Sequence, residues 1–166
     1  MVSSSQVLVR AEVDRLTFED FYAAESRRVF DSAFAFCGNR DVAAEATQEA
    51  FARAYARWWR LSRKEWAGAW VTTTALNVIR RTFRDASRRP PQEHEHVTAD
   101  LSQRVDLLTA LRKLPTRQRQ AAVLYYVTDL PIAVVAETMN VSEGAVKSHL
   151  SRARETLRVQ LEVRHA

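Results

Sequence analysis

The sequence predicts an all-α protein made of two small helical domains joined by a flexible linker. Only 3 glycines and 4 prolines occur in 166 residues, so long stretches contain no helix breaker. Apolar residues recur at spacings of three and four, without the sustained alternation typical of strands. Pro90 and Pro91 open a polar segment without helical periodicity. We therefore expect an N-terminal domain over 12–87, a linker over 88–103 and a C-terminal domain over 104–163.

Three long helices are expected in the N-terminal domain. Their predicted spans are Thr17–Phe36, Val42–Trp59 and Ala69–Arg88. Gly38 suits the left-handed conformation that ends many helices. Asp41 is the expected N-cap of the second helix, because its carboxylate can accept a backbone N–H. The chain is expected to turn around Gly68 before the third helix.

Four shorter helices are expected in the C-terminal domain. Their predicted spans are Leu101–Leu114, Pro115–Val127, Pro131–Met139 and a last helix from the Ser142 cap to Val163. Asn140 is the expected turn residue before the last helix, since asparagine tolerates positive φ. The last helix carries an apolar stripe at spacings of four, three and four, formed by Val146, Leu150, Ala153 and Leu157. A short helix, a tight turn and a second helix with one buried face predict a helix-turn-helix.

The charge of the chain permits binding to nucleic acid without proving it. The formal net charge is +5 and the pI is about 9.9. A second, polar stripe on the last helix contains Lys147, Ser151, Arg154 and Arg158. This face could be a solvated surface, or it could contact DNA, because a helix of this width fits the major groove. The cap and the preceding short helix favour DNA binding.

The C-terminal half resembles region 4 of the sigma-70 family, in its extracytoplasmic-function (ECF) group. The resemblance is carried by residues 111–158, which read LRKLPTRQRQAAVLYYVTDLPIAVVAETMNVSEGAVKSHLSRARETLR. It implies that the last helix contacts the −35 promoter element through Ser142, Glu143, Lys147, Ser148, His149 and Arg152. Many members of the family have arginine where this chain has His149, and a neutral imidazole cannot make the two-pronged contact of a guanidinium. LuxR-like regulators carry similar motifs.

The N-terminal half resembles region 2 of the same family. FEDFYAAESRRVFDSAFAFCGNRDVAAEATQEAFARAYARWWRL and the later WVTTTALNVIRRTFRDASRR carry this second resemblance. It implies that core RNA polymerase contacts Glu45, Gln48, Glu49 and Phe51. It also implies that the −10 element contacts Trp66, Asn77, Arg80, Arg81, Arg84 and Arg88. Leu76 stands where the family often has arginine.

Two features of the N-terminal half allow a structural and a functional interpretation. The four tryptophans fall within thirteen positions, as Trp58, Trp59, Trp66 and Trp70, and could form a core or stack on unpaired bases. Arg80, Arg84 and Arg88 lie on one helical face and form a basic ridge. Such a ridge suits phosphate contacts, and a solvated surface is the alternative.

No motif for catalysis or metal binding is found in the sequence. A Walker-type glycine loop, a nucleophile elbow and an HExxH pair are all missing. His94 and His96 lie in the expected linker, which is a poor preformed metal site. Cys37 is the single cysteine and is expected to pack as a small apolar residue. We expect no enzyme activity and no cofactor. Without a signal peptide or membrane span, we expect a cytoplasmic location.

The resemblance implies an ECF sigma factor that binds core RNA polymerase and directs initiation at promoter DNA. An anti-sigma factor is a further expected partner, because members of the group are often held inactive by one. Two alternatives stay open. The chain could be a stand-alone helix-turn-helix regulator with an N-terminal sensor domain, or an interaction module that sequesters a partner.

Overall fold

The computed structural model describes residues 16–86 and 102–165, and within these residues it contains helices and no strands. The all-α prediction is confirmed. The N-terminal unit contains α2 (Phe18–Cys37), α3 (Arg40–Tyr55), α4 (Trp58–Leu61) and α5 (Ala67–Ala86). The C-terminal unit contains α6 (Ser102–Lys113), α7 (Thr116–Ala122), the π-helical turn η1 (Val123–Val127), α8 (Ile132–Met139) and α9 (Glu143–His165).

The first helix begins and ends where its local sequence predicts. The Thr17 side chain accepts a hydrogen bond from the backbone N–H of Asp20 at 3.1 Å and so caps the N-terminus. Gly38 closes the helix with φ of 69°, and its N–H donates to the carbonyl of Phe34 at 2.7 Å. Glycine adopts this left-handed conformation without the steric cost that a β-carbon would bring.

The next two predicted helices differ from the structure at their ends. Asn39, not Asp41, caps α3, because its side-chain oxygen accepts from the N–H groups of Asp41 and Val42, each at 3.0 Å. The helix also ends at Tyr55, and the short α4 follows as a separate element. Gly68 lies in the first turn of α5 rather than in a loop. A β-carbon there would lie 2.8 Å from the Glu25 carboxylate, so glycine allows α5 to approach α2.

The helix-turn-helix is present as predicted. Asn140 follows α8 in the left-handed conformation, with φ of 54°. Ser142 caps α9 by accepting the N–H of Ala145 at 3.1 Å. The predicted stripe packs inward, since Val146, Leu150 and Ala153 are buried. The sequence carried no signal that α7 would continue into the π-helical η1.

Two apolar clusters hold the described residues together. The aromatic cluster lies entirely in the N-terminal unit, where Phe18, Trp58 and Trp70 pack against buried Phe21 and Phe51. The second cluster, which we call the joint cluster, contains residues of both units. Its members include Phe36, Leu76 and Ile79 from the N-terminal unit, and Leu111, Leu124 and Val135 from the C-terminal unit.

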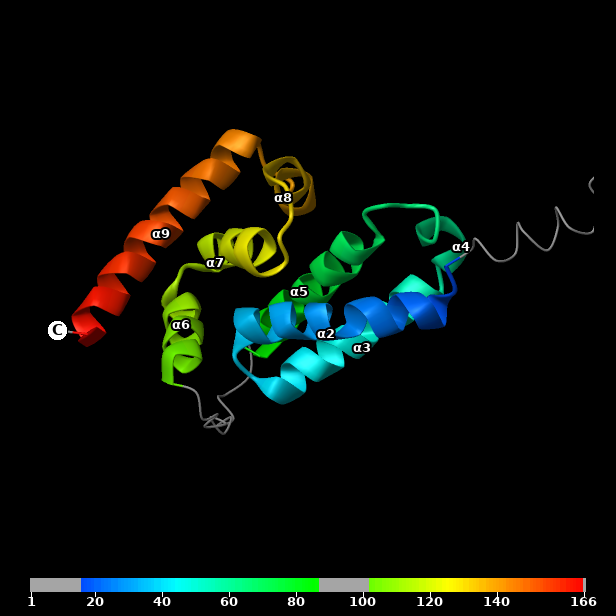
Figure 1. The fold of residues 1–166 in the computed structure, drawn as a ribbon, viewed down its shortest axis with the longest axis horizontal. Coiled ribbons are helices and arrows are strands. Elements are labelled where there is room, and N and C mark those ends of the chain that lie inside the picture. Colours follow the sequence, from blue (N-terminus) through cyan, green and yellow to red (C-terminus); the bar gives the residue numbers. More distant parts are fainter. Residues whose placement is uncertain (1–15, 87–101, 166) are drawn as a thin grey trace, which may run out of the picture.

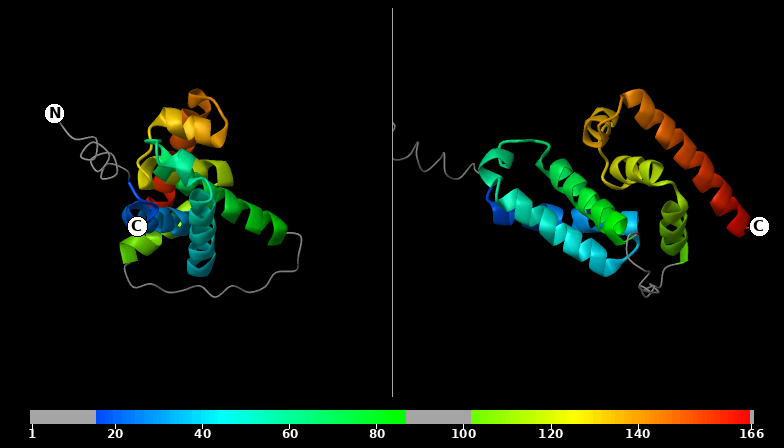
Figure 2. Two further views of the ribbon diagram at one scale, coloured as in Figure 1. Left: turned by 90° about the vertical axis from the view of Figure 1, so that its right-hand side faces the viewer. Right: turned by 180° about the vertical axis from the view of Figure 1, so that it is seen from behind.

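The two units therefore lie against each other rather than apart. Helices α6 and η1 contact α2, and α8 contacts α5. Figure 1 shows α2, α3 and α5 as one bundle, α9 at the opposite edge of the molecule, and α6, α7 and α8 between them. The same order is seen from behind in the right-hand view of Figure 2.

Candidate polymerase- and DNA-binding surfaces

Three of the four residues predicted to contact polymerase share the outer surface of α3. Glu45, Gln48 and Glu49 are exposed, and they line a shallow hollow between α3 and α5. The Glu49 carboxylate accepts a hydrogen bond from the Arg53 guanidinium at 2.8 Å, so its position is fixed by a neighbour one turn away. Asn77 and Arg81 line the same hollow from α5.

The fourth predicted polymerase contact, Phe51, does not lie on this surface. Its side chain is 3% exposed. Its ring centroid lies 4.8 Å from that of Tyr22 and 5.9 Å from that of Phe21. Phe51 therefore anchors α3 in the aromatic cluster, on the opposite side of the helix from the exposed glutamates.

The residues predicted to contact the −10 element are spread along α5. Trp66 is 48% exposed just before the helix begins, and Asn77, Arg81 and Arg84 are exposed further along. At 1.5 Å per helical residue, Asn77 lies about 16 Å from Trp66 along the axis. The two residues therefore cannot share one pocket. Arg88 lies outside the described residues.

Arg80 is half-buried, whereas Arg81 and Arg84 are exposed. It lines a hollow that also contains Thr116 and Arg119 of the C-terminal unit. Burial lowers the pKa of the Arg80 guanidinium, and the positive charges of Arg117 and Arg84 lower it further. The structure thus places one predicted DNA contact at the boundary between the two units.

Leu76 is fully buried in the joint cluster. The family's arginine is therefore replaced here by a core residue. An arginine at this position would require a buried guanidinium among apolar side chains.

A third hollow lies around Trp66 and contains basic residues that were not among the predicted DNA contacts. The Arg60 guanidinium lies 4.7 Å from the centroid of the Trp59 ring, and the Lys64 ammonium lies 5.9 Å from that of Trp66. We call this the tryptophan hollow; it is lined by Arg57, Trp59, Arg60, Leu61, Arg63, Lys64, Trp66 and Trp70. The clustering of tryptophans among basic residues was the signal in the sequence that could have predicted it.

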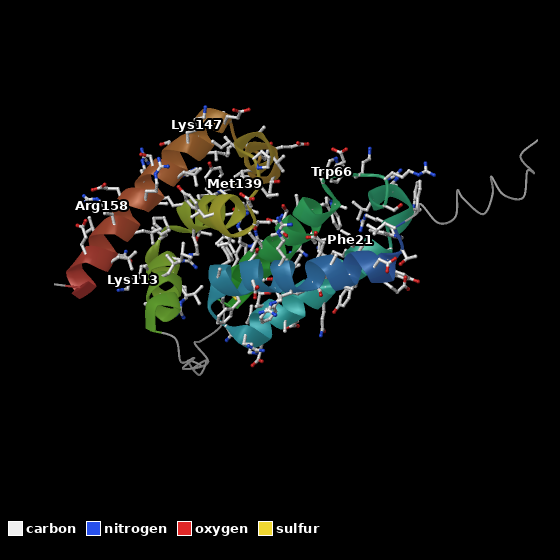
Figure 3. All side chains as sticks on the ribbon, in the orientation of Figure 1. Phe21, Trp66, Lys113, Met139, Lys147 and Arg158 are labelled. Carbon is white, nitrogen blue, oxygen red and sulfur yellow. The ribbon has the colours of Figure 1, made fainter. Side chains whose placement is uncertain are left out.

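The residues predicted to contact the −35 element lie on the outer face of α9 and at its start. Ser142, Glu143, Lys147, Ser148 and Arg152 are exposed, and His149 is half-buried. Figure 3 shows Lys147 near the first turn of α9 and Arg158 well along the same helix. Arg158 already pairs with Glu155 at 2.9 Å and with Glu162 at 3.0 Å. The charge of Arg158 is thus met by two carboxylates, whereas Lys147 and Arg152 present theirs on the exposed first half of α9.

Cys37 is buried, as predicted for a packing residue, and its thiol donates to the Asn39 carbonyl at 3.3 Å. Burial raises the pKa of the thiol, which favours the neutral and less reactive form. In the part of the chain that the structure describes, no group of three or more His, Cys, Asp or Glu residues is arranged to hold a metal ion. His94 and His96 lie outside this part. None of the described helices has the length and apolar character needed to cross a membrane.

The helix-turn-helix presents a basic helix outward, and the neighbouring bundle presents exposed tryptophans and arginines. Together these surfaces define the class as a helical DNA-binding protein that acts in transcription. Comparison with known proteins identifies the class further. The pattern of sigma-70 region 2 matches residues 21–89, and that of sigma-70 region 4 matches residues 104–157. The chain belongs to the sigma-70 family of RNA polymerase sigma factors, in its ECF group. It is a transcription initiation factor, and sigma factors bind core RNA polymerase and promoter DNA.

Individual relatives span most of the chain. The RNA polymerase sigma-E factor of Streptomyces antibioticus is 30% identical over 129 residues, covering 74% of this chain and 72% of the relative. The ECF sigma factor SigW of Bacillus subtilis is 27% identical over 169 residues, covering 89% of this chain and 90% of SigW. The fold is also similar to the sigma factor RpoE of Bartonella quintana, solved in complex with the anti-sigma factor NepR. The TM-score is 0.74 at 22% identity, with 88% of this chain and 97% of that chain covered.

Proposed function

We propose that the two helical units divide promoter recognition between them. The N-terminal unit (12–87) would bind core polymerase through α3 and the −10 element through α5 and the tryptophan hollow. The C-terminal unit (104–163) would bind the −35 element through α9, with residues 88–103 as the linker. The observation that carries this proposal is that one chain presents two exposed surfaces suited to DNA, one aromatic and basic and one on a helix-turn-helix.

The outer face of α3 suits a basic partner surface. Glu45 and Glu49 supply carboxylates, and Gln48 supplies an amide between them. The opposite face of the helix is locked by buried alanines and Phe51, so these polar groups are held in fixed positions. A rigid polar face loses little conformational entropy on docking.

The surface around α5 suits a single DNA strand rather than a duplex. Indole rings stack on any base, and nearby cations contact the phosphates. From Trp66 to Arg84 is about 27 Å along the helix, which corresponds to roughly eight stacked nucleotides at 3.4 Å each. An extruded base could enter the tryptophan hollow at one end while Arg81 and Arg84 contact phosphates at the other.

The first half of α9 suits the major groove. Lys147 and Arg152 are exposed there, and the buried stripe holds α9 against the rest of the C-terminal unit. Half-buried His149 can donate one hydrogen bond when neutral, where an arginine could donate two in parallel. We propose that base discrimination opposite His149 is weaker than in relatives with arginine.

The chain would itself catalyse no reaction, because RNA synthesis is carried out by the polymerase it directs. Its place of action would be the cytoplasm, where promoter DNA and polymerase are found together. An anti-sigma factor is a proposed regulatory partner, since the structurally similar RpoE was solved with one.

Gel filtration with bacterial core polymerase tests the α3 surface. A Gln48→Ala, Glu49→Ala variant is expected to lose co-elution that the wild type shows. An Arg27→Ala, Asp31→Ala variant is the matched control, because it removes an exposed i,i+4 pair from α2 instead. Equal co-elution of both variants would remove α3 from the polymerase interface, and elution of wild type alone would contradict polymerase binding itself.

Salt titration of holoenzyme binding tests the α9 surface. Lys147→Ala and Arg152→Ala are each expected to reduce the slope of log K against log salt by about one, because each removes a phosphate or base contact. Arg158→Ala is the matched control, since that guanidinium is already paired with acidic neighbours. Unchanged slopes for all three would contradict the assignment, and tight binding to duplex without polymerase would favour a stand-alone regulator.

A further inference from the structure

The hollow that contains Arg80 lies at the boundary between the two units and is lined by arginines from both. Its volume is about 620 Å³, within the range of about 300–1,000 Å³ that is typical of small-molecule sites. We call it the arginine hollow; it is lined by Phe36, Asn77, Arg80, Arg81, Phe83, Arg84, Thr116 and Arg119. Three of its arginines come from α5, and Arg119 comes from α7 together with Thr116.

The two walls of the arginine hollow are held at a defined separation by hydrogen bonds that cross the boundary. The Ser32 and Thr128 hydroxyls lie 3.0 Å apart, and Arg28 donates to the Thr128 carbonyl at 3.2 Å. Arg119 donates to the Phe36 carbonyl at 3.1 Å. Because Ser32 and Thr128 are buried, their pairing indicates a defined interface. The hollow is therefore already formed in the chain alone.

Positive charge dominates the arginine hollow. Four guanidiniums line it, and no Asp or Glu is found among its described lining residues. The Asp85 carboxylate, 4.0 Å from the Arg84 guanidinium, offsets one of these charges in part. Burial lowers the pKa of Arg80, and the charges of Arg117 and Arg84 lower it further, so like charges repel across the boundary as well as along α5. An anion among these groups would relieve the repulsion.

Arg119 contributes a charge that cannot move away from the hollow. Besides the Phe36 carbonyl, its guanidinium donates to the carbonyls of Arg112 and Leu114, at 2.6 and 3.0 Å. It also lies 5.6 Å from the centroid of the Phe36 ring. An exposed arginine loses side-chain entropy when it contacts a ligand, whereas Arg119 is fixed in advance.

The side chains of the hollow suit a ligand that carries several phosphates and a base. A guanidinium contacts a phosphate through two parallel hydrogen bonds. Arg80 and Arg84 are one helical turn apart, about 6 Å along α5, so a chain of phosphates can contact more of the cluster than a single phosphate can. Phe83 is 40% exposed and offers a ring on which a base can stack.

We propose that the arginine hollow binds a nucleoside di- or triphosphate, with the phosphates between the arginines of α5 and α7 and the base on Phe83. This inference goes beyond the proposed function, because the binding needs neither polymerase nor promoter. A DNA strand carries the same phosphate groups, but the path proposed for it follows α5 and does not include α7. Thr116 therefore distinguishes the two sources of phosphate.

Calorimetric titration of the purified protein, without polymerase, tests the site. The probes are ATP without added Mg²⁺, inorganic tripolyphosphate and inorganic phosphate, at one ionic strength. Tripolyphosphate is expected to bind at least about tenfold more tightly than phosphate. Arg80→Gln should weaken ATP and tripolyphosphate about tenfold, because it removes one charge-assisted contact. Arg27→Gln is the matched control, since it removes the same charge from a side chain of α2 that is 92% exposed.

Two further variants test the ligand class and the contribution of α7. Phe83→Ala should weaken ATP but leave tripolyphosphate unchanged, because only ATP has a base to stack. Thr116→Asp places a carboxylate in the hollow from an exposed position of α7 and should weaken both polyphosphates. Ser151→Asp adds the same charge to an exposed position of α9 and is its control. A single-stranded DNA of eight thymidines should bind equally to Thr116→Asp and to the wild type.

Each outcome decides one part of the inference, provided that circular dichroism shows native helix content in every variant. Absence of binding by ATP and tripolyphosphate would overturn the site. Equal losses in Arg80→Gln and Arg27→Gln would reduce it to non-specific attraction by a basic protein. Polyphosphate binding that Thr116→Asp does not change would reduce it to the DNA-binding face of α5. An unchanged affinity of Phe83→Ala for ATP would exclude the stacked base. Failure of polymerase binding in gel filtration would contradict the proposed function and leave these results standing.

Discussion

The aromatic cluster and the joint cluster stabilise the molecule in different ways. The aromatic cluster lies within α2–α5 and is built from large rings such as Phe21 and Phe51. The joint cluster is built mainly from alanine, valine and leucine, and it draws on both units. The N-terminal unit therefore has a core of its own as well as a shared one, whereas every buried apolar residue described in the C-terminal unit except Ala110 belongs to the shared core. The C-terminal unit is expected to depend more on the contact.

Phe51→Ala should have the largest effect, because it removes a buried ring from the self-contained core. We expect the free energy of unfolding to fall by about 3–5 kcal/mol. All four tryptophans lie in this unit, so tryptophan fluorescence in urea measures the change directly. Trp59→Ala, which removes a ring that is 68% exposed, is the control and should cost less than about 1 kcal/mol. Similar losses for both variants would contradict the assignment of Phe51 to the core.

Leu124→Ala should destabilise the shared core by about 2–5 kcal/mol. Because Leu124 lies in the C-terminal unit and has no exposed surface, the helical signal in circular dichroism should be lost at lower urea. The tryptophan transition should move less, since the aromatic cluster remains complete. Coincident shifts of both signals would show that the two units unfold as one, and would remove the distinction between the clusters.

Gly38→Ala should cost about 1–2 kcal/mol from the left-handed backbone alone. The added β-carbon would also collide with the Arg112 side chain of α6, so the variant strains the contact between the units. Gly144→Ala is the matched control, because a β-carbon there makes only an ordinary contact with Ser142 Oγ, at 3.8 Å, and should stabilise the helix by up to about 1 kcal/mol. Urea unfolding of both variants measures the change in the free energy of unfolding, which should fall for Gly38→Ala and rise for Gly144→Ala.

Asn39→Ala should have the smallest effect, about 1 kcal/mol, because it removes one helix cap from the N-terminal unit. Asp41→Ala loses only the favourable charge in the first turn of α3 and should cost a few tenths of that amount, roughly 0.3 kcal/mol. Thermal melts of the two variants compare them. A larger loss of stability for Asp41→Ala than for Asn39→Ala would indicate that Asp41 is the N-cap of α3, as predicted from the sequence.

Local signals explain which parts of this fold could be predicted. The capping and turn roles of Gly38, Asn140 and Ser142 depend only on their own backbone or on one turn of helix. The neighbouring residues in the sequence therefore predict these roles. Asn39 and Asp41 are both good caps two positions apart, and local chemistry does not choose between them. Phe51 fits an apolar anchor at an interface as well as a core ring, and only the positions of Phe21 and Tyr22 decide which it is.

The contact between the units could not be predicted, because it joins residues far apart in the chain. Ser32 and Thr128 are 96 positions apart, and Arg119 and Phe36 are 83 positions apart. Neither contact is indicated by a periodic pattern or a motif in the sequence. The predicted flexible linker was inferred from composition alone, and composition describes the connecting segment but not the surfaces of the units that it connects.

The Arg119 guanidinium donates to the carbonyls of Phe36, Arg112 and Leu114, and these three hydrogen bonds imply an order of assembly. Two of them, from Arg112 and Leu114, lie at the corner between α6 and α7, so the guanidinium is aimed at Phe36 only after that corner has formed. The N-terminal unit leaves the ribosome first and can complete its aromatic core unaided. The hydrogen bond to Phe36 can then form only late in biosynthesis, after the corner between α6 and α7 has been synthesised and folded.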